Sequence, residues 1–148
     1  MSRPGERWLI AGAGLSAAAA IAHLAVIAGG PDWYRFFGAG EEMALMAERG
    51  SPVPALITLA IAALLATWAA YALAAAGRIR RLPLMRAALV AISAVYLLRG
   101  LILFPALVLN PGLVDAFMLW SSLIVLAYGI VYAIGTFRAW PALARASS

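Results

Sequence analysis

Four long apolar stretches constrain the fold of this chain more than any other feature. A helix that crosses a bilayer needs about 20 predominantly apolar residues, and four stretches of the sequence meet that requirement. They are residues 8–28, 53–76, 84–104 and 114–137. None shows the short alternating pattern of a membrane-spanning strand. The sequence therefore predicts an all-α integral membrane protein, in which residues 1–148 form one bundle of four transmembrane helices.

The composition excludes a soluble globular domain and a disordered chain. Hydrophobic residues make up 66% of the sequence and charged residues 11%, against roughly 45–50% and 25% in soluble domains. The first apolar stretch is also longer than the roughly 7–15 residues of a cleaved signal core. We therefore expect it to be retained as a membrane span.

The distribution of arginine predicts the orientation. All 11 basic residues are arginine. Eight of them lie in the N-terminal segment, after the fourth stretch, or between the second stretch and the first turn of the third, which holds Arg86. Residues 29–52 hold two arginines and four acids. Because positively charged flanks stay in the cytoplasm, we expect both termini there and the 29–52 link outside. A bacterial-type inner membrane is the expected location.

The outward link carries signals for two short helices. A helix is expected to begin at Pro31, with an acid in its first turn. Gly40 should separate it from a second helix that begins at Glu41 and ends before Gly50, a plausible position for a left-handed glycine. We expect residues 31–50 to form a helical cap at the outer membrane surface.

Two Xaa-Pro pairs predict where membrane helices begin. Ser51 precedes Pro52 at the second apolar stretch, and Asn110 precedes Pro111 at the fourth. A short polar side chain followed by proline is typical of a helix N-terminus.

Arg99 is the most informative single residue, because apolar sequence lies on both sides of it. An arginine at the centre of a membrane helix costs about 2.5–3.5 kcal/mol on insertion scales. It could extend to the outer headgroups, but side chains lean toward the helix N-terminus, which is the cytoplasmic end here. We favour a buried, partnered Arg99 over an extended one. Pro105 should kink or end the helix just beyond it.

Several polar residues are candidate partners of Arg99. His23 shares a small-residue face with Gly12 and Ser16 and lies at a similar depth, and Tyr96 precedes Arg99 by one turn. The ligand-binding candidates are Arg99, His23, Tyr96, Glu41, Glu42 and Asp115.

Each partner also has a structural interpretation. His23 could bond a neighbouring carbonyl within the bundle. The three acids Glu41, Glu42 and Asp115 could simply stabilise helix N-termini through the helix dipole.

The sequence contains no recognisable cofactor or metal motif. It has no cysteine and one histidine, so thiolate sites and paired histidine ligands are excluded within one chain. No phosphate loop or catalytic signature is present. The arginines lie at the ends of apolar runs, so we expect no nucleic-acid partner, no cofactor and no bound metal.

Three functions remain open at this stage. The favoured one is a non-enzymatic protein with an outward-facing polar pocket that binds or conducts a small ion, anion or lipid headgroup, in transport or sensing. The first alternative is an accessory or scaffold subunit of a membrane complex. The second is a membrane enzyme acting on a lipid or isoprenoid substrate. Expected partners are membrane lipids, further copies of the chain, or another membrane protein.

Overall fold

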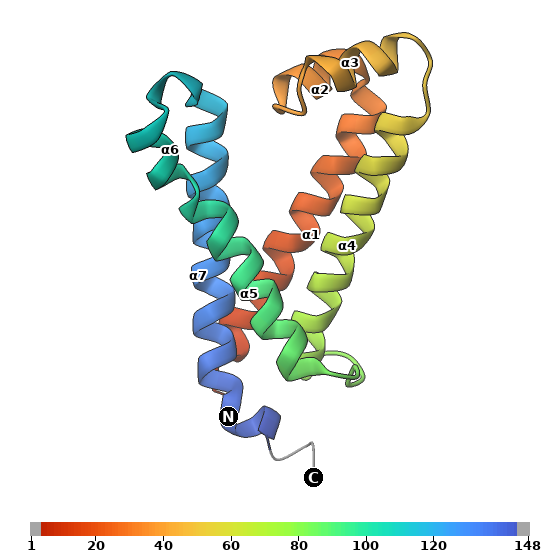
Figure 1. The fold of residues 1–148 in the computed structure, drawn as a ribbon. Coiled ribbons are helices and arrows are strands. Elements are labelled where there is room, and N and C mark those ends of the chain that lie inside the picture. The colour runs from red at the N-terminus through yellow and green to blue at the C-terminus, as the bar shows by residue number, and fades with distance from the viewer. Residues whose placement is uncertain (1–3, 145–148) are drawn as a thin grey trace. The chain divides into compact units, whose positions relative to one another are not determined.

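The computed structural model describes residues 4–144, and that part of the chain contains helices and no strand (Figure 1). The all-helical prediction is confirmed for these residues. In chain order the elements are α1 (Glu6–Gly29), α2 (Pro31–Phe36), α3 (Glu41–Glu48), α4 (Val53–Ala75), α5 (Met85–Leu101), α6 (Leu103–Leu109), the 3-10 turn η1 (Pro111–Leu113) and α7 (Ala116–Ala144).

Four helical segments are long and apolar enough to cross a membrane, which confirms the predicted number of spans. They are Glu6–Gly29, Val53–Ala75, Met85–Leu109 and Ala116–Leu143. Their lengths of 24, 23, 25 and 28 residues exceed the roughly 20 residues that a bilayer core requires. The length and apolar composition of these four helices are those of membrane-spanning helices.

The third span is longer than the sequence indicates, because it continues after a break. α5 ends at Leu101 and α6 begins at Leu103, so the predicted end near Phe104 falls inside α6. Pro105 has no N–H group, so the carbonyl of Leu101 lacks its usual helical donor. The helix is interrupted at Ile102, close to the place expected from Pro105, but the helical segment runs on to Leu109.

The start of the fourth span also differs from the sequence prediction. Asn110 and Pro111 open the short turn η1 rather than a membrane helix. The long helix begins at Ala116, where the Asp115 carboxylate accepts a 2.6 Å hydrogen bond from the Met118 N–H. Asp115 is therefore the capping residue that the Asn110-Pro111 pair was expected to supply.

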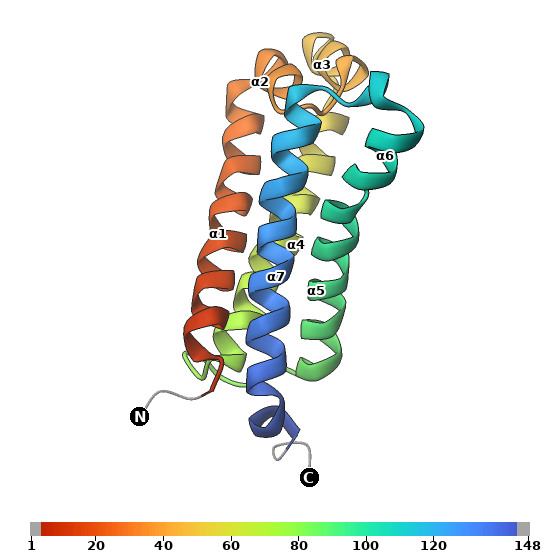
Figure 2. The same ribbon diagram turned by 90° about the vertical axis from the view of Figure 1, so that its left-hand side faces the viewer.

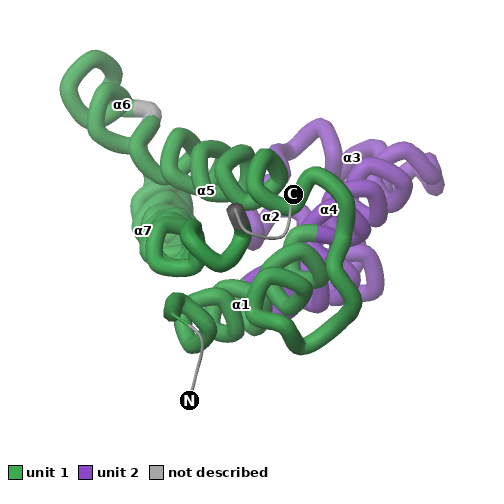
Figure 3. The backbone as a smooth tube through the Cα atoms, turned by 90° about the horizontal axis from the view of Figure 1, so that it is seen from below, with its two compact units in different colours: residues 1–15, 68–148 green, residues 16–67 purple. Residues whose placement is uncertain are grey.

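The chain divides into two compact units (Figure 3). Unit 1 comprises residues 1–15 and 68–148, and unit 2 comprises residues 16–67. The boundaries fall within α1 and α4, so each of these helices contributes to both units.

The main contact of unit 1 is between α5 and α7, which lie side by side (Figures 1 and 2). Two glycines allow their backbones to approach. A Cβ atom built on Gly100 would lie 2.6 Å from Leu126 Cα, and one built on Gly129 would lie 2.7 Å from the Leu97 nitrogen. Close packing of small residues is how helices associate where lipid is as apolar as the side chains.

The first turns of α1 pack on α7 in the same unit. A Cβ on Gly12 would lie 2.9 Å from the Tyr132 ring, and the Tyr132 side chain is fully buried. Glu6 accepts a 2.7 Å hydrogen bond from Arg78, which ties the start of α1 to the link before α5.

Unit 2 contains the two short helices that the sequence predicts between the first two spans. α3 ends in a Schellman motif at Gly50, where φ is 74°. In this motif the Ser51 N–H donates to the Met46 carbonyl and the Gly50 N–H to the Ala47 carbonyl. Ser51 Oγ accepts from the Val53 N–H at 3.3 Å, as expected for a residue that opens α4.

A small apolar core holds the short helices to the end of α1. Val26, Tyr34 and Ala44 are buried together, and Tyr34 is 2% exposed. α2 and α3 are thus packed helices and not a loose loop.

Candidate functional site

Arg99 lies in the last turn of α5, and its only hydrogen bond within the described part of the chain is to a hydroxyl on α7. The Arg99 Nη1 group donates to Ser122 Oγ at 3.0 Å. Ser122 is fully buried, whereas Arg99 itself is exposed. One nitrogen of the guanidinium, Nη1, is therefore hydrogen-bonded to Ser122, and the group has further N–H donors for another acceptor.

Arg99 is near the middle of the third span. It follows Met85 by fourteen residues and precedes Leu109 by ten, which is about 21 Å and 15 Å of helix at 1.5 Å per residue. The continuation of the helix to Leu109 places the nearer end of the span farther from Arg99 than the sequence suggested. Extension of the side chain to a surface is correspondingly less favourable.

No carboxylate in residues 4–144 forms an ion pair with Arg99, and most of the acids contact other groups. Glu6 contacts Arg78, and Asp115 caps α7. Three more acids surround Arg35: Asp32, Glu41 and Glu48. Only Glu42 remains of the six acids in the chain. The carboxylate partner expected for Arg99 is not among the contacts that the described residues make.

Tyr96, the candidate one turn before Arg99, belongs to an aromatic cluster. It is 5% exposed and lies 4.9 Å from Trp68, 5.6 Å from Tyr128 and 5.5 Å from Tyr132, measured between ring centroids. The Tyr132 hydroxyl donates to the Trp68 carbonyl at 3.2 Å. Edge-to-face aromatic contacts of this kind add to the packing of a core, so Tyr96 has a clear structural role.

His23 is half-buried on α1 in unit 2, and its hydrogen bond is to a backbone carbonyl of the same helix. Its Nδ1 lies 2.8 Å from the Ala19 carbonyl oxygen, four residues earlier. A carbonyl can only accept, so Nδ1 carries the proton and Nε2 is the ring nitrogen left for another partner. The structural interpretation of His23 as a carbonyl-bonded side chain accounts for this geometry.

Comparison with family models, with curated proteins and with solved structures finds no match to this chain. The interpretation of the site therefore depends on its geometry.

Glu41 takes part in an ion cluster centred on Arg35. Arg35 Nε donates to Glu41 Oε2 at 2.9 Å and Arg35 Nη2 donates to Glu41 Oε1 at 2.8 Å, a two-point contact. Nη2 also donates to Glu48 at 2.7 Å, and Nη1 to Asp32 at 3.3 Å. This cluster connects α2 to α3. It also shifts protonation: the hydrogen bond from Arg35 lowers the pKa of Glu41 below its ordinary value of 4.5.

The Arg35 cluster should make the contact between α2 and α3 sensitive to acid. Because the pKa of Glu41 is lowered in the folded protein, its contribution to stability is present above pH 4.5 and is lost as the pH falls through the lower folded value. We expect faster amide hydrogen exchange in residues 31–50 well below pH 4.5 than at pH 6, after correction for the intrinsic rate. Glu41→Gln should show the faster exchange at both pH values.

Glu42→Gln is the matched control for this prediction. Glu42 is the neighbouring acid in the first turn of α3 and is absent from the contacts of Arg35. Two results would show that the Arg35 cluster does not hold α2 and α3 together. One is an equal amide exchange rate in Glu41→Gln and Glu42→Gln, and the other is a corrected exchange rate in the wild type that does not change with pH.

The six sequence candidates are divided between the two units. Arg99, Tyr96 and Asp115 belong to unit 1, and His23, Glu41 and Glu42 belong to unit 2. Within unit 1, Arg99 and Tyr96 are one turn apart on α5, while Asp115 caps a different helix. A pocket that combines all six stays a prediction.

Sequence reasoning missed Ser122 and the role of Arg35. The hydroxyl of the neighbouring Ser121 instead donates to the Met118 carbonyl on its own helix. A signal for Ser122 exists: Ser122, Gly129 and Thr136 are small residues at seven-residue spacing, which places them on one helix face. All three are buried.

The residues that the structure describes contain no group of three His, Asp or Glu side chains placed to hold a metal ion.

Proposed function

We propose that this protein binds an anionic group at Arg99, within the span formed by α5 and α6. The ligand class is a small anion or an anionic lipid headgroup, bound for transport or sensing. The observation that carries the proposal is a mid-span guanidinium bonded to the buried Ser122 hydroxyl, with no carboxylate of residues 4–144 in contact. An intramembrane charge without a partner is costly, and a bound anion would offset that cost.

The proposed topology follows from the arginine distribution. Both termini are assigned to the cytoplasm of a bacterial-type inner membrane, because eight arginines flank the spans on that side. The packed pair α2 and α3 is then the outward cap, and Arg99 is in the outer half of the bilayer. His23, Glu41 and Glu42 belong to unit 2, and their part in ligand binding stays a prediction.

Anion-dependent stability of the purified protein tests this proposal. The protein in neutral detergent is titrated with bromide, inorganic phosphate or a short-chain phosphatidylglycerol, and the thermal midpoint is followed, since a ligand of the folded state raises it. A hydrogen bond to a charged group contributes about 1.5–3 kcal/mol, so Arg99→Leu should weaken the anion effect by tenfold or more. Arg99→Lys should retain part of it.

Arg49→Leu is the matched control, because it removes one exposed arginine outside the spans. It should bind the anion as the wild type does. If Arg99→Leu folds and responds to all three anions as the wild type does, the proposal fails. Chloride or bromide flux into liposomes then separates conduction from binding alone.

The exposure of Arg99 also supports a second candidate function, an accessory subunit. In that case the acceptor for the guanidinium is a carboxylate of another chain, since charges at this depth face protein more often than lipid. Mass spectrometry of the detergent-extracted complex distinguishes the two. A stoichiometric protein partner lost in Arg99→Leu would favour the subunit, and a monomer with an anion-dependent midpoint would favour the binding protein.

A further inference from the structure

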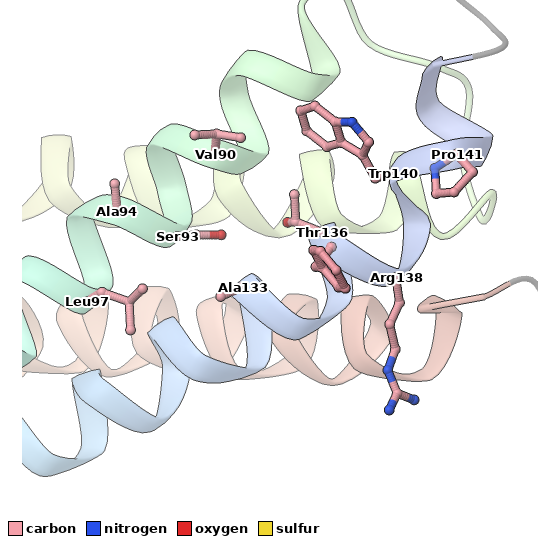
Figure 4. A pocket seen from close by; sticks show the side chains of 10 residues that line it. Val90, Ser93, Ala94, Leu97, Ala133, Thr136, Arg138, Trp140 and Pro141 are labelled. Carbon is pink, nitrogen blue, oxygen red and sulfur yellow. The ribbon is translucent and has the colours of Figure 1, made fainter.

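An apolar hollow lies between α5 and α7, away from Arg99. Its volume is about 880 Å³. On the α5 side it is lined by Val90, Ser93, Ala94 and Leu97, and on the α7 side mainly by Ala133, Thr136 and Trp140 (Figure 4). On α5 the lining residues of the hollow lie between the close contact at Gly100 and the arginine-rich link before the helix.

The hollow contains one polar group without a partner. Thr136 is 5% exposed, and its covered Oγ1 forms no hydrogen bond with any residue in the described part of the chain. Ser93 differs, because its hydroxyl already donates to the Leu89 carbonyl at 2.7 Å. A covered hydroxyl facing an apolar hollow is expected to bond a polar group of whatever fills it.

An arginine outside the lining of the hollow contacts Trp140, which is one of the lining residues. The Arg86 guanidinium lies 4.2 Å from the centre of the Trp140 ring, a cation–π contact, and its covered Nε has no partner in residues 4–144. A second hollow of about 470 Å³ is lined by residues 81–87 and Leu143, and so includes Arg81 and Arg86. Glu6 forms an ion pair with Arg78, in the link between α4 and α5.

Arg138 does not belong with Arg81 and Arg86, although it lines the hollow. Its guanidinium is directed away from the labelled side chains of α5 (Figure 4). It lies 5.9 Å from the Trp8 ring. A ligand that extended past Trp140 would meet Arg86, which contacts the Trp140 ring, and Arg81, which lines the second hollow with it.

We infer that this groove binds one anionic glycerophospholipid. The acyl chain fills the space between Val90 and Ala133, the ester carbonyl accepts from the Thr136 hydroxyl, and the phosphate is bound by Arg86 and Arg81. The distance from Val90 to Leu97 is about 10 Å along the helix, so part of one chain is enclosed. Basic sites between membrane helices bind anionic headgroups in this way.

Native mass spectrometry with defined lipids tests the inference. The full-length protein is stripped of lipid in detergent and mixed with equal amounts of phosphatidylglycerol and phosphatidylcholine. One phosphatidylglycerol should remain bound per chain, with about 25-fold preference over phosphatidylcholine, about fivefold for each of the two arginines. Arg86→Gln should lower that preference about fivefold, and Arg86→Lys should preserve it.

A pair of filling variants tests the acyl-chain position. Ala133→Phe puts a ring into the groove and should abolish the bound lipid. Ala127→Phe is the matched control, because Ala127 is exposed and nine residues, or two and a half turns, from Thr136. It should bind lipid as the wild type does. If Ala133→Phe does not fold, the inference is still tested by the preference for phosphatidylglycerol in Arg86→Gln compared with that in Arg86→Lys.

The inference is overturned by any of three results. These are equal retention of the two lipids by the wild type, unchanged retention in both Ala133→Phe and Arg86→Gln, or a dimer that carries no lipid. The site is separate from the proposed anion site, since Arg99→Leu should leave the lipid adduct unchanged. The two proposals can therefore fail independently.

Discussion

Gly100→Ala and Gly129→Ala are each expected to destabilise the protein by about 1–3 kcal/mol, the usual cost of adding a group to a close-packed contact. The added Cβ would lie 2.6 Å from Leu126 Cα in the first case and 2.7 Å from the Leu97 nitrogen in the second. Both neighbours are backbone atoms, so a side-chain rotation cannot relieve the contact. The helices α5 and α7 would have to separate.

Gly14→Ala is the matched control, because it adds the same methyl group to another membrane helix. A Cβ on Gly14 meets no atom within 4 Å, and alanine is favoured over glycine in a helix by about 1 kcal/mol. We expect Gly14→Ala to be neutral or stabilising in an SDS-titration measurement of unfolding. Equal effects at Gly14 and Gly100 would contradict the close approach of α5 and α7.

Tyr132→Ala is expected to be the most destabilising single substitution, at about 3–5 kcal/mol for removal of a buried aromatic ring. Tyr132 is 0% exposed, contacts Gly12 and packs at a tilt against Tyr96, with 5.5 Å between the ring centroids. Its loss leaves a cavity where α1, α5 and α7 of unit 1 meet. The free energy of unfolding in mixed micelles measures the effect.

Two controls separate packing from hydrogen bonding at this position. Tyr132→Phe removes the hydroxyl that bonds the Trp68 carbonyl, and such bonds in membrane proteins average about 0.6 kcal/mol. Phe137→Ala, on the same helix, removes a ring that is 83% exposed and should change stability little. A large effect of Tyr132→Phe with a small effect of Tyr132→Ala is incompatible with the cluster described above.

The fold was largely predictable because its signals are local. The four spans follow from apolar length, and α2 and α3 follow from Pro31, the glycines between them and Gly50. The errors also have local causes. The sequence around Pro105 permits either a stop or a kink. Asn110 and Asp115 can both cap a helix, and the short turn η1 between them leaves Asp115 as the cap of α7.

The site was predictable only in part, because its contacts depend on helix rotation. Arg99 is conspicuous from its cost in lipid, but its partner depends on which face of α7 meets α5. That rotation is set by the approach at Gly129 and Gly100, which selects Ser122 over its neighbour Ser121. The Arg35 cluster likewise depends on the turn that folds α3 back against α2.

The most direct test of the central claim is an experimental map of the protein in a lipid environment containing bromide, with anomalous scattering used to locate the ion. We predict a bromide peak within hydrogen-bonding distance of the Arg99 guanidinium on the side opposite Ser122, and no peak there in Arg99→Leu. A guanidinium bonded to a carboxylate of the same chain, or surrounded only by acyl chains, would contradict the proposed anion site.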